Sequence, residues 1–249
     1  MIQLERYETN SSEYSTDLDH LQERLYILSK VAYERKKLIV IVLEGWSGTG
    51  KGDLLKTITH RLDPRKFSAY SHEVSSYSKK HHFLKKYWEK IPPNGHLFLV
   101  LDSWYEFVTK GFMEGEVSRE EYQKGFYSIS NFENTLISDD CVIYKFFLHS
   151  SKKLMKKRFK QAKKENRIWV LSKADKNQIK NYEEYYEIFE HSINQTNTIF
   201  APWNIISAEN KDRTKFLILS QLVSELEKVF EVDSAEILLK LDSLEDIVA

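Results

Sequence analysis

The chain has 249 residues, and 37 Lys and Arg residues balance 37 Asp and Glu residues, so its formal net charge is zero. This length suits one large α/β domain, and the balanced charge gives no global signal for nucleic acid or a membrane as partner. The single cysteine, Cys141, excludes an intrachain disulfide. Because no targeting peptide or membrane-length apolar run is present, a cytoplasmic protein is predicted.

The first segments predict a helix that precedes any strand. Residues 1–15 are polar and are expected to be loosely held. Thr16 or Asp17 can cap a helix that continues to about Lys36, so that residues 1–37 form an N-terminal helical extension. One face of this helix is apolar and can pack on the domain or on a second copy of the chain; the face holds Leu18, Leu21, Leu25, Leu28 and Ala32.

Residues 38–53 read LIVIVLEGWSGTGKGD and are the motif around which the chain is organised. The apolar run 38–43 predicts a strand buried on both faces. Gly45, four further residues, Gly50 and Lys51 fit the spacing G-x-x-x-x-G-K, and a helical pattern follows over residues 53–62. Strand, glycine-rich turn and helix in this order predict a phosphate-binding loop rather than a simple glycine turn.

The chemistry of this loop follows from its residue types. Glycines permit a tight turn that aims backbone N–H groups inward, the helix N-terminus adds positive potential, and Lys51 supplies a full charge. Gly52 follows the lysine, so the hydroxyl that usually helps to hold Mg²⁺ there is absent. The predicted phosphate-binding residues of the loop are Gly45, Ser47, Gly48, Thr49, Gly50, Lys51 and Gly52.

A second functional candidate ends the next buried strand. The apolar run Leu97–Leu101 is closed by Asp102, the pattern of the carboxylate that organises Mg²⁺ in phosphate-loop enzymes. Asp53 or Glu44 could supply a further oxygen ligand. Alternatively, Asp102 caps a helix that begins near Ser103.

The segment Ser151–Arg167 is the strongest charge cluster of the chain, with nine Lys or Arg residues and one Glu. It follows a predicted strand end, where ligands gather in open α/β sheets, which favours an anion-binding role. The alternative is a solvated helix face, the usual role of charged runs.

The remaining elements are predicted by periodicity and by capping residues. They are a strand at 67–74, a helix at 79–91 capped by Ser78, a helix from Ser118 to about Ile137 opened by a capping box with Glu121, strands at 141–148 and 204–208, a helix at 176–198 opened by Asp175 and Gln178, a helix at 211–230 and a final helix at 233–249. This alternation predicts one domain over residues 1–249, with a parallel five-stranded sheet and helices on both faces.

Several of these segments together resemble the second polyphosphate kinase family, the polyphosphate:nucleotide phosphotransferases. They are LQERL before the first strand, LEGWSGTGKG, RLDPR at 61–65, SWY at 103–105, KFFLH at 145–149, KRF at 157–159, R-x-W-x-L at 167–171 and APW at 201–203. The resemblance implies an α/β, P-loop kinase-like three-layer sandwich with a mobile helical lid at about residues 151–198. It also implies Mg²⁺ as cofactor, with inorganic polyphosphate and a nucleotide (AMP or ADP, or GMP or GDP) as substrates.

The chain departs from the family pattern at charged positions. Ser47 stands where the family's loop carries an acid, and Gly48–Thr49 replace two alanines. The family has an acid or amide and then Arg before SWY, whereas this chain has Leu101 and Asp102 there. Either the acid position is Leu101, or one residue is deleted and Asp102 is the family's acid; the Arg is missing in both cases.

The resemblance implies a role for each candidate. Lys51 and the loop amides would bind the transferring phosphoryl group, and Asp102, with Asp53, would hold the metal. Arg158 and Arg167 would close over the phosphates, while Lys156 and Lys160 would attract the rest of the polyphosphate chain.

Three hypotheses follow: an active phosphotransferase, a degenerate nucleotide- or polyphosphate-binding protein on the same scaffold, and an ordinary small-molecule kinase or nucleotide hydrolase. The degenerate protein is suggested by the altered charged positions, whereas the lid and APW segments argue against an ordinary kinase. A homo-oligomer, dimer or tetramer, is also expected.

Overall fold

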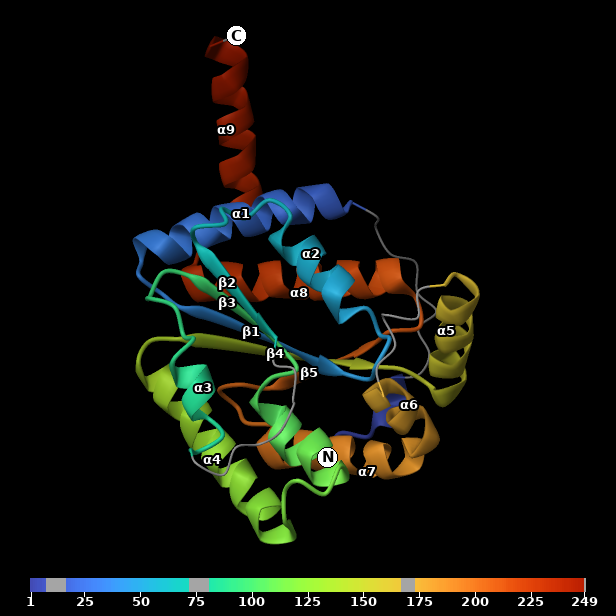
Figure 1. The fold of residues 1–249 in the computed structure, drawn as a ribbon. Helices are drawn as coiled ribbons and strands as arrows, with labels where there is room; N and C mark the ends of the chain where they lie inside the picture. The colour runs from blue at the N-terminus through green and yellow to red at the C-terminus, as the bar shows by residue number, and fades with distance from the viewer. Residues whose placement is uncertain (8–16, 72–80, 167–172, 249) are drawn as a thin grey trace.

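The structure is a computed structural model that describes residues 1–7, 17–71, 81–166 and 173–248. Five strands form one sheet in the order β2-β3-β1-β4-β5, and every neighbouring pair is parallel (Figure 1). They are β1 (Ile39–Gly45), β2 (Phe67–Ser71), β3 (Leu97–Leu101), β4 (Val142–His149) and β5 (Trp203–Ser207). The prediction of an α/β fold on a five-stranded parallel sheet is confirmed.

The central strand β1 decides where the site lies. All of its residues are buried, as its continuous apolar run predicts for a strand covered on both faces. It pairs with β3 up to Leu43–Leu101 and with β4 up to Gly45–Leu148. Because the strands are parallel, the loop after β1 and the residue after β3 emerge at the same edge of the sheet.

One face of the sheet is covered by α1 (Leu18–Glu34), α2 (Lys51–Thr59) and α8 (Lys211–Phe230) (Figure 1). Asp17 caps α1 by accepting a hydrogen bond from the backbone N–H of His20 at 3.0 Å, as predicted. The apolar face of α1 packs in the same core cluster as the buried face of α8. It therefore packs on its own domain, which was one of the two alternatives left by the sequence.

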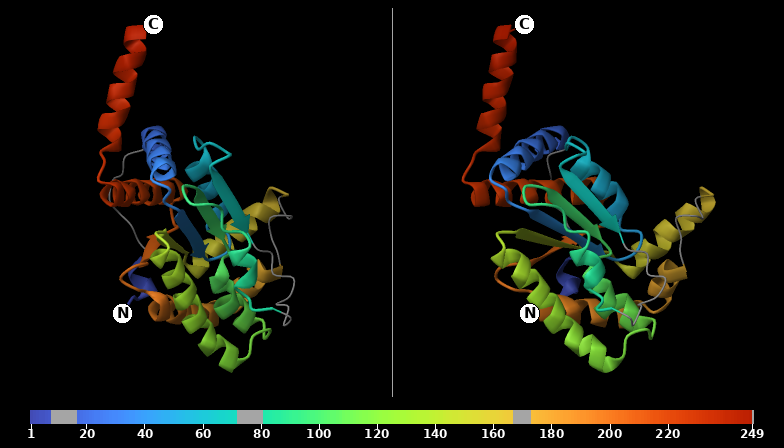
Figure 2. Two further views of the ribbon diagram at one scale, coloured as in Figure 1. Left: turned by 90° about the vertical axis from the view of Figure 1, so that its left-hand side faces the viewer. Right: turned by 60° about the vertical axis from the view of Figure 1, so that its left-hand side comes forward.

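The opposite face is covered by α4 (Arg119–Ser138) and α7 (Tyr182–Thr196), together with the short α3 (Lys85–Trp88) (Figure 2). The Ser118–Glu121 capping box that opens α4 is present, which confirms that prediction. Between β3 and α4 lie a 3-10 turn, η2 (Trp104–Glu106), and one π-helical turn, η3 (Phe107–Gly111). The helices on both faces complete a three-layer arrangement.

The predicted lid region begins with α5 (Lys152–Lys164), which is capped by Ser151 and lies beside the carboxyl edge of the sheet (Figure 1). The predicted single helix at 176–198 is wrong. Two separate helices, α6 (Lys173–Lys180) and α7, take its place. They are divided at Asn181, whose φ of −105° and ψ of 39° are not helical. Asp175 lies inside α6 instead of capping it, and the Gln178 side chain is used elsewhere.

Two other expectations differ from the structure. Residues 1–7 are not loose: η1 (Leu4–Tyr7) buries Leu4 completely, and the backbone N–H groups of Ile2 and Leu4 donate to side chains of α7. The helix expected over 79–91 is reduced to α3, because residues 81–84 turn before it. Ser78 and the last residues of the strand expected at 67–74 lie outside the described residues.

The chain ends in α9 (Ser234–Val248), which projects from the body of the molecule (Figure 2). This confirms the helix predicted there. Among the described residues, no helix is both long and apolar enough to cross a membrane.

The end of β1 gives a test of this architecture. Gly45 has a φ of +134°, and a Cβ there would lie 2.3 Å from the backbone oxygen of Leu148. We expect Gly45→Ala to lower the free energy of unfolding by about 3 kcal/mol or more, because neither backbone can move without breaking the sheet. Chemical denaturation measures this loss.

Gly52→Ala is the matched control, since nothing lies within 4 Å of a Cβ there and the residue sits in the first turn of α2. Its stability should stay within about 1 kcal/mol of wild type. Equal stabilities for the two variants would contradict the close approach of β1 and β4.

Candidate active site

The predicted phosphate loop connects β1 to α2. Gly45, Gly48 and Gly50 have φ values of 134°, 74° and 95°, a region that residues with side chains rarely adopt. Inside the loop, the Thr49 hydroxyl donates to the carbonyl of Trp46 at 2.7 Å. Helix α2 begins at Lys51 with no side-chain cap. Its first N–H groups have no acceptor within the helix and are available to an anion.

Lys51 is the charge at the centre of the site. Its Nζ lies 3.1 Å from Asp102 Oδ1 and donates to the Gly45 carbonyl at 3.0 Å. Its side chain is only 15% exposed, less than a free surface lysine. Burial lowers the pKa of Lys51, but Asp102 and then Glu44 outweigh burial and raise it. The ammonium is therefore held charged by the carboxylates around it.

The structure excludes one of the two readings of Asp102, that of a helix cap. The 3-10 turn after β3 is capped by Ser103, whose hydroxyl accepts from the backbone N–H of Tyr105 at 3.4 Å. Asp102 is therefore not the helix cap, and its carboxylate pairs with Lys51. The backbone of Asp102 adopts a φ of 47°, a left-handed conformation that is costly for a residue with a side chain.

Two further carboxyl groups lie close enough to Asp102 and Lys51 to affect their charges. Glu44 is buried, and its Oε1 accepts from the backbone N–H and the hydroxyl of Ser103, each at 2.7 Å. Burial and then the charge of Asp102 raise the pKa of Glu44 to about 7. The same two causes raise the pKa of Glu106 to about 8.

Glu106 was missed by the sequence reasoning. Its side chain is 10% exposed, and Lys110 Nζ lies 3.7 Å from its Oε1. Its Oε2 has no hydrogen-bond partner within the described ranges. Because a buried acid without a full set of partners is costly, Glu106 is a candidate for a functional position. The only local signal was an acid directly after the SWY segment.

The residues around Asp102 could supply some, but not all, of the ligands of a magnesium ion. Asp102 offers carboxylate oxygens, the ligands that Mg²⁺ prefers, on a side chain that is 35% exposed. Across residues 1–7, 17–71, 81–166 and 173–248, no group of three or more His, Cys, Asp or Glu residues could enclose a metal. A bound Mg²⁺ would therefore depend on water and substrate phosphates for most of its ligands. Asp53, the other predicted ligand, is exposed and lies 3.7 Å from Lys211 Nζ.

Helices α5 and α6 of the predicted lid region both contact the loop after β1. Arg158 of α5 donates through Nη1 to the Gly48 carbonyl at 3.0 Å and through Nη2 to the Ala208 carbonyl at 2.6 Å. The backbone N–H of Ser47 donates to Gln178 Oε1 of α6 at 2.8 Å. The structure thus places Arg158, the predicted phosphate ligand, beside the loop, and adds Gln178, which the sequence suggested only as a helix cap.

The other predicted binding residues of the lid region are exposed to solvent or lie outside the described residues. Lys156 and Lys160 are exposed on α5, accessible to a ligand in solvent. Arg167 lies outside the described residues.

Behind the loop, Trp46 attaches it to the core. The indole is fully buried and stacks on Tyr182 of α7 with ring centroids 4.2 Å apart. Its Nε1 donates to Nδ1 of His149 at 3.1 Å, which requires the imidazole to be unprotonated at that atom. Burial lowers the pKa of His149 to about 4. The aromatic side chains of α7 that meet Trp46 therefore serve packing.

The sequence profile described as Polyphosphate kinase 2 matches residues 8–233. The chain belongs to the polyphosphate kinase 2 family. A structure of a polyphosphate kinase 2 from Arthrobacter aurescens TC1 superposes with a TM-score of 0.81 at 21% identity, covering 96% of each chain. This similarity establishes the P-loop kinase-like fold.

Relatives in this family carry names that state an activity. A polyphosphate:AMP phosphotransferase of Pseudomonas syringae is 26% identical over 229 residues, which cover 89% of this chain and 46% of that protein. The chain therefore spans about half the length of this relative. ADP-polyphosphate phosphotransferase 3 of Rhizobium meliloti is 28% identical over 225 residues, which cover 89% of this chain and 79% of that protein.

The raised pKa of Glu106 predicts a pH-dependent stability. The pKa of its carboxyl is about 8 in the folded chain against an ordinary 4.5, so the fold favours the neutral acid. This favourable contribution is complete below pH 4.5 and is lost as the pH rises towards 8. Glu106→Gln removes the effect, so the variant should gain stability relative to wild type by up to about 4 kcal/mol between pH 5 and pH 9.

Urea unfolding of the ligand-free protein at both pH values measures this gain. Glu116→Gln, at an exposed position, is the matched control and should show a constant difference from wild type. A constant difference for Glu106→Gln as well would show that its carboxyl ionises normally.

Proposed function

We propose that this protein is a phosphotransferase that moves a phosphoryl group between inorganic polyphosphate and a nucleoside mono- or diphosphate, with Mg²⁺. The observation that carries the proposal is the 3.1 Å pair of Lys51 and Asp102, formed where a glycine-rich phosphate loop and the end of β3 meet. The names of its relatives in the polyphosphate kinase 2 family support the substrate classes.

The chain's own residues bind and orient the phosphates. The N–H groups of the loop and of the first turn of α2 donate to phosphate oxygens, and Lys51 neutralises their charge. Arg158, already hydrogen-bonded to the loop at Gly48, stabilises charge that develops on the transferring group. Magnesium, when bound, neutralises and orients neighbouring phosphates. No covalent intermediate on the protein is required, because positioning and electrostatics suffice for this class of reaction.

The Lys51–Asp102 pair also explains how the buried ammonium of Lys51 is stabilised before a ligand binds. A buried ammonium without a partner would be costly, and the Asp102 carboxylate and the Gly45 carbonyl satisfy it. A phosphate oxygen can take over one of these contacts, which leaves the carboxylate of Asp102 for the metal. Asp53 could join it only after leaving Lys211, and Asp102 is therefore the stronger candidate ligand.

The proposal predicts that Lys51→Ala abolishes phosphoryl transfer. Wild type is incubated with polyphosphate, Mg²⁺ and AMP, ADP, GMP or GDP in separate reactions, and the nucleotides are separated by chromatography. The variant should lose at least about 100-fold in rate because it removes a charge that stabilises the transition state. Circular dichroism confirms its fold, and Lys56→Ala, on a nearby part of α2, is the control.

New nucleotide from wild type supports the proposal and also identifies the nucleotide. Binding of polyphosphate or nucleotide without turnover would instead indicate the degenerate binding protein, for which the altered loop residue Ser47 argues. Full activity in a folded Lys51→Ala variant would remove the loop from the mechanism.

A second prediction concerns the basic helix α5. We expect the triple substitution of Lys156, Lys160 and Lys163 by Gln to weaken polyphosphate binding by about tenfold. Nucleotide binding should weaken much less. All three lysines are exposed, so the effect should shrink at high salt, where charges are screened within a few ångströms. Calorimetric titration at low and high salt measures both ligands.

Changing Lys124, Lys228 and Lys240 to Gln gives the same change in net charge on other helices. This control should leave polyphosphate affinity close to wild type. Equal losses in the two triple variants would mean that α5 presents only a solvated face.

A further inference from the structure

Asp102 lies at the start of a strained turn. We call residues Asp102–Tyr105 the acid turn. A φ of 47° places Asp102 in the left-handed region, which costs about 1–3 kcal/mol for a residue with a side chain. Such a conformation persists only where the surrounding structure holds it. The contacts of the three following residues show what holds it.

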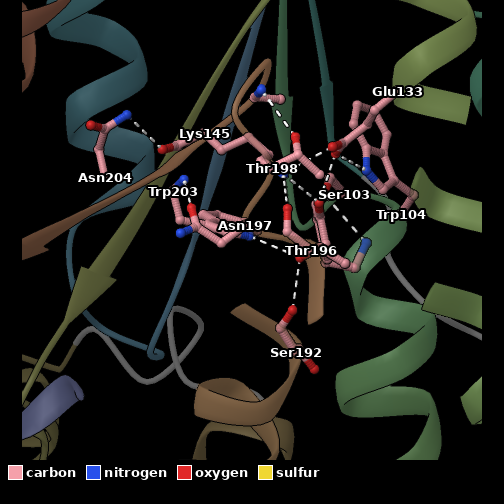
Figure 3. A network of polar contacts seen from close by, with 12 residues as sticks. Ser103, Trp104, Glu133, Lys145, Ser192, Thr196, Asn197, Thr198, Trp203 and Asn204 are labelled. Carbon is pink, nitrogen blue, oxygen red and sulfur yellow. Dashed lines mark hydrogen bonds and ion pairs between the residues drawn. The ribbon is translucent and has the colours of Figure 1, made fainter. Parts of the chain in front are cut away.

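The acid turn is tied down by two buried carboxylates on opposite sides. Glu44 of β1 accepts two hydrogen bonds from Ser103, both at 2.7 Å. Glu133 of α4 uses one oxygen, Oε1, to accept from Trp104 Nε1 at 3.0 Å and from the Tyr105 hydroxyl at 2.7 Å (Figure 3). Every residue after Asp102 in the turn is therefore fixed by a carboxylate.

Lys145 of β4 completes the second anchor. Its Nζ donates to Glu133 Oε2 at 2.9 Å, to the Tyr105 hydroxyl at 3.0 Å and to the Thr196 carbonyl at 2.8 Å (Figure 3). These contacts use all three donors of an ammonium. The side chains of Lys145 and Glu133 are 0% and 3% exposed. Burial lowers the pKa of Lys145, while the charge of Glu133 opposes that change.

A buried ion pair of this kind contributes little to the free energy of unfolding, so stability alone does not explain it. Two apolar residues of similar size often stabilise a core as well or better, because they need no desolvation. What an apolar pair cannot supply is direction: the oxygens of Glu133 fix the orientation of one indole N–H and one phenol hydroxyl. The pair therefore specifies the position of the acid turn rather than merely filling the core.

We propose that Glu133 and Lys145 are positioning residues that hold the acid turn so that the Asp102 carboxylate faces Lys51. The part played by Asp102 in catalysis rests on the proposed function, but its placement against Lys51 does not. The inference also gives a physical reason why the SWY and KFFLH segments occur together, since Trp104 and Tyr105 contact the anchor that Lys145 completes.

The test removes the anchor without leaving a lone buried charge. In Glu133→Leu combined with Lys145→Met, the core stays filled, so we expect the protein to fold. Amide hydrogen exchange at residues 103–105 should rise at least about tenfold, with no change in β1. Lys51 should also react several-fold faster with acetic anhydride, approaching its rate in Asp102→Asn, because its partner carboxylate has moved.

Tyr105→Phe serves as a second variant should the double variant not fold. It removes one hydroxyl and with it the contacts to Glu133 and Lys145, and the same two changes are expected in smaller degree. Tyr144→Phe is the matched control, since it also removes a buried phenol hydroxyl, from a β4 residue that packs with α1 and α8 on the other face of the sheet. It should change neither exchange at 103–105 nor labelling of Lys51.

Unchanged exchange and labelling in a folded double variant or in Tyr105→Phe would overturn the inference. Equal changes in Tyr144→Phe would also overturn it, because they would show a general loosening of the core. Neither readout uses polyphosphate or nucleotide. A wild-type protein without transferase activity would therefore refute the proposed function while leaving this test decisive.

Discussion

The ion pair between Lys51 and Asp102 is the contact on which the site depends. It joins the loop after β1 to the turn after β3, two segments that only the parallel sheet brings together. Glu44 and Glu106 lie close enough to interact with both charges. If all three carboxyl groups were ionised, the ammonium groups of Lys51 and Lys110 could not balance them, and an anionic phosphate would be repelled. The raised pKa values of Glu44 and Glu106 reduce this repulsion near neutral pH.

The part of the fold that could be predicted is the part encoded by local patterns. An unbroken apolar run, three glycines and a lysine at fixed spacing defined β1, the loop and α2 without any tertiary information. The acid after β3 was predictable for the same reason, because strand ends meet at one edge of a parallel sheet. The capping box of α4 was also local. These features need only neighbouring residues in the chain.

The residues that were missed depend on distant partners. Glu133 reads as an ordinary polar position on an amphipathic helix, and it becomes a buried anchor only when Lys145 and the acid turn pack against it. Gln178 fits a capping pattern, yet its oxygen accepts a hydrogen bond from a loop residue 131 positions away. Leu4 lies in a short segment without a helical or strand pattern, and nothing local indicates that it is buried. Patterns of spacing cannot report such contacts.

Under the proposed function, the contacts of α5 and α6 with the loop would connect phosphate binding to the position of these helices. Gln178 of α6 occupies the N–H of Ser47, a donor that a phosphate-binding loop would offer to its ligand, while Arg158 of α5 holds the neighbouring carbonyl of Gly48. A phosphate that takes the Ser47 donor must displace Gln178. A ligand that attracts Arg158 likewise removes its bond to Gly48. A ligand shifts an equilibrium only through contacts that differ between the protein's states. Under the proposed function, these two exchanges are the contacts through which phosphate binding would shift the position of α5 and α6.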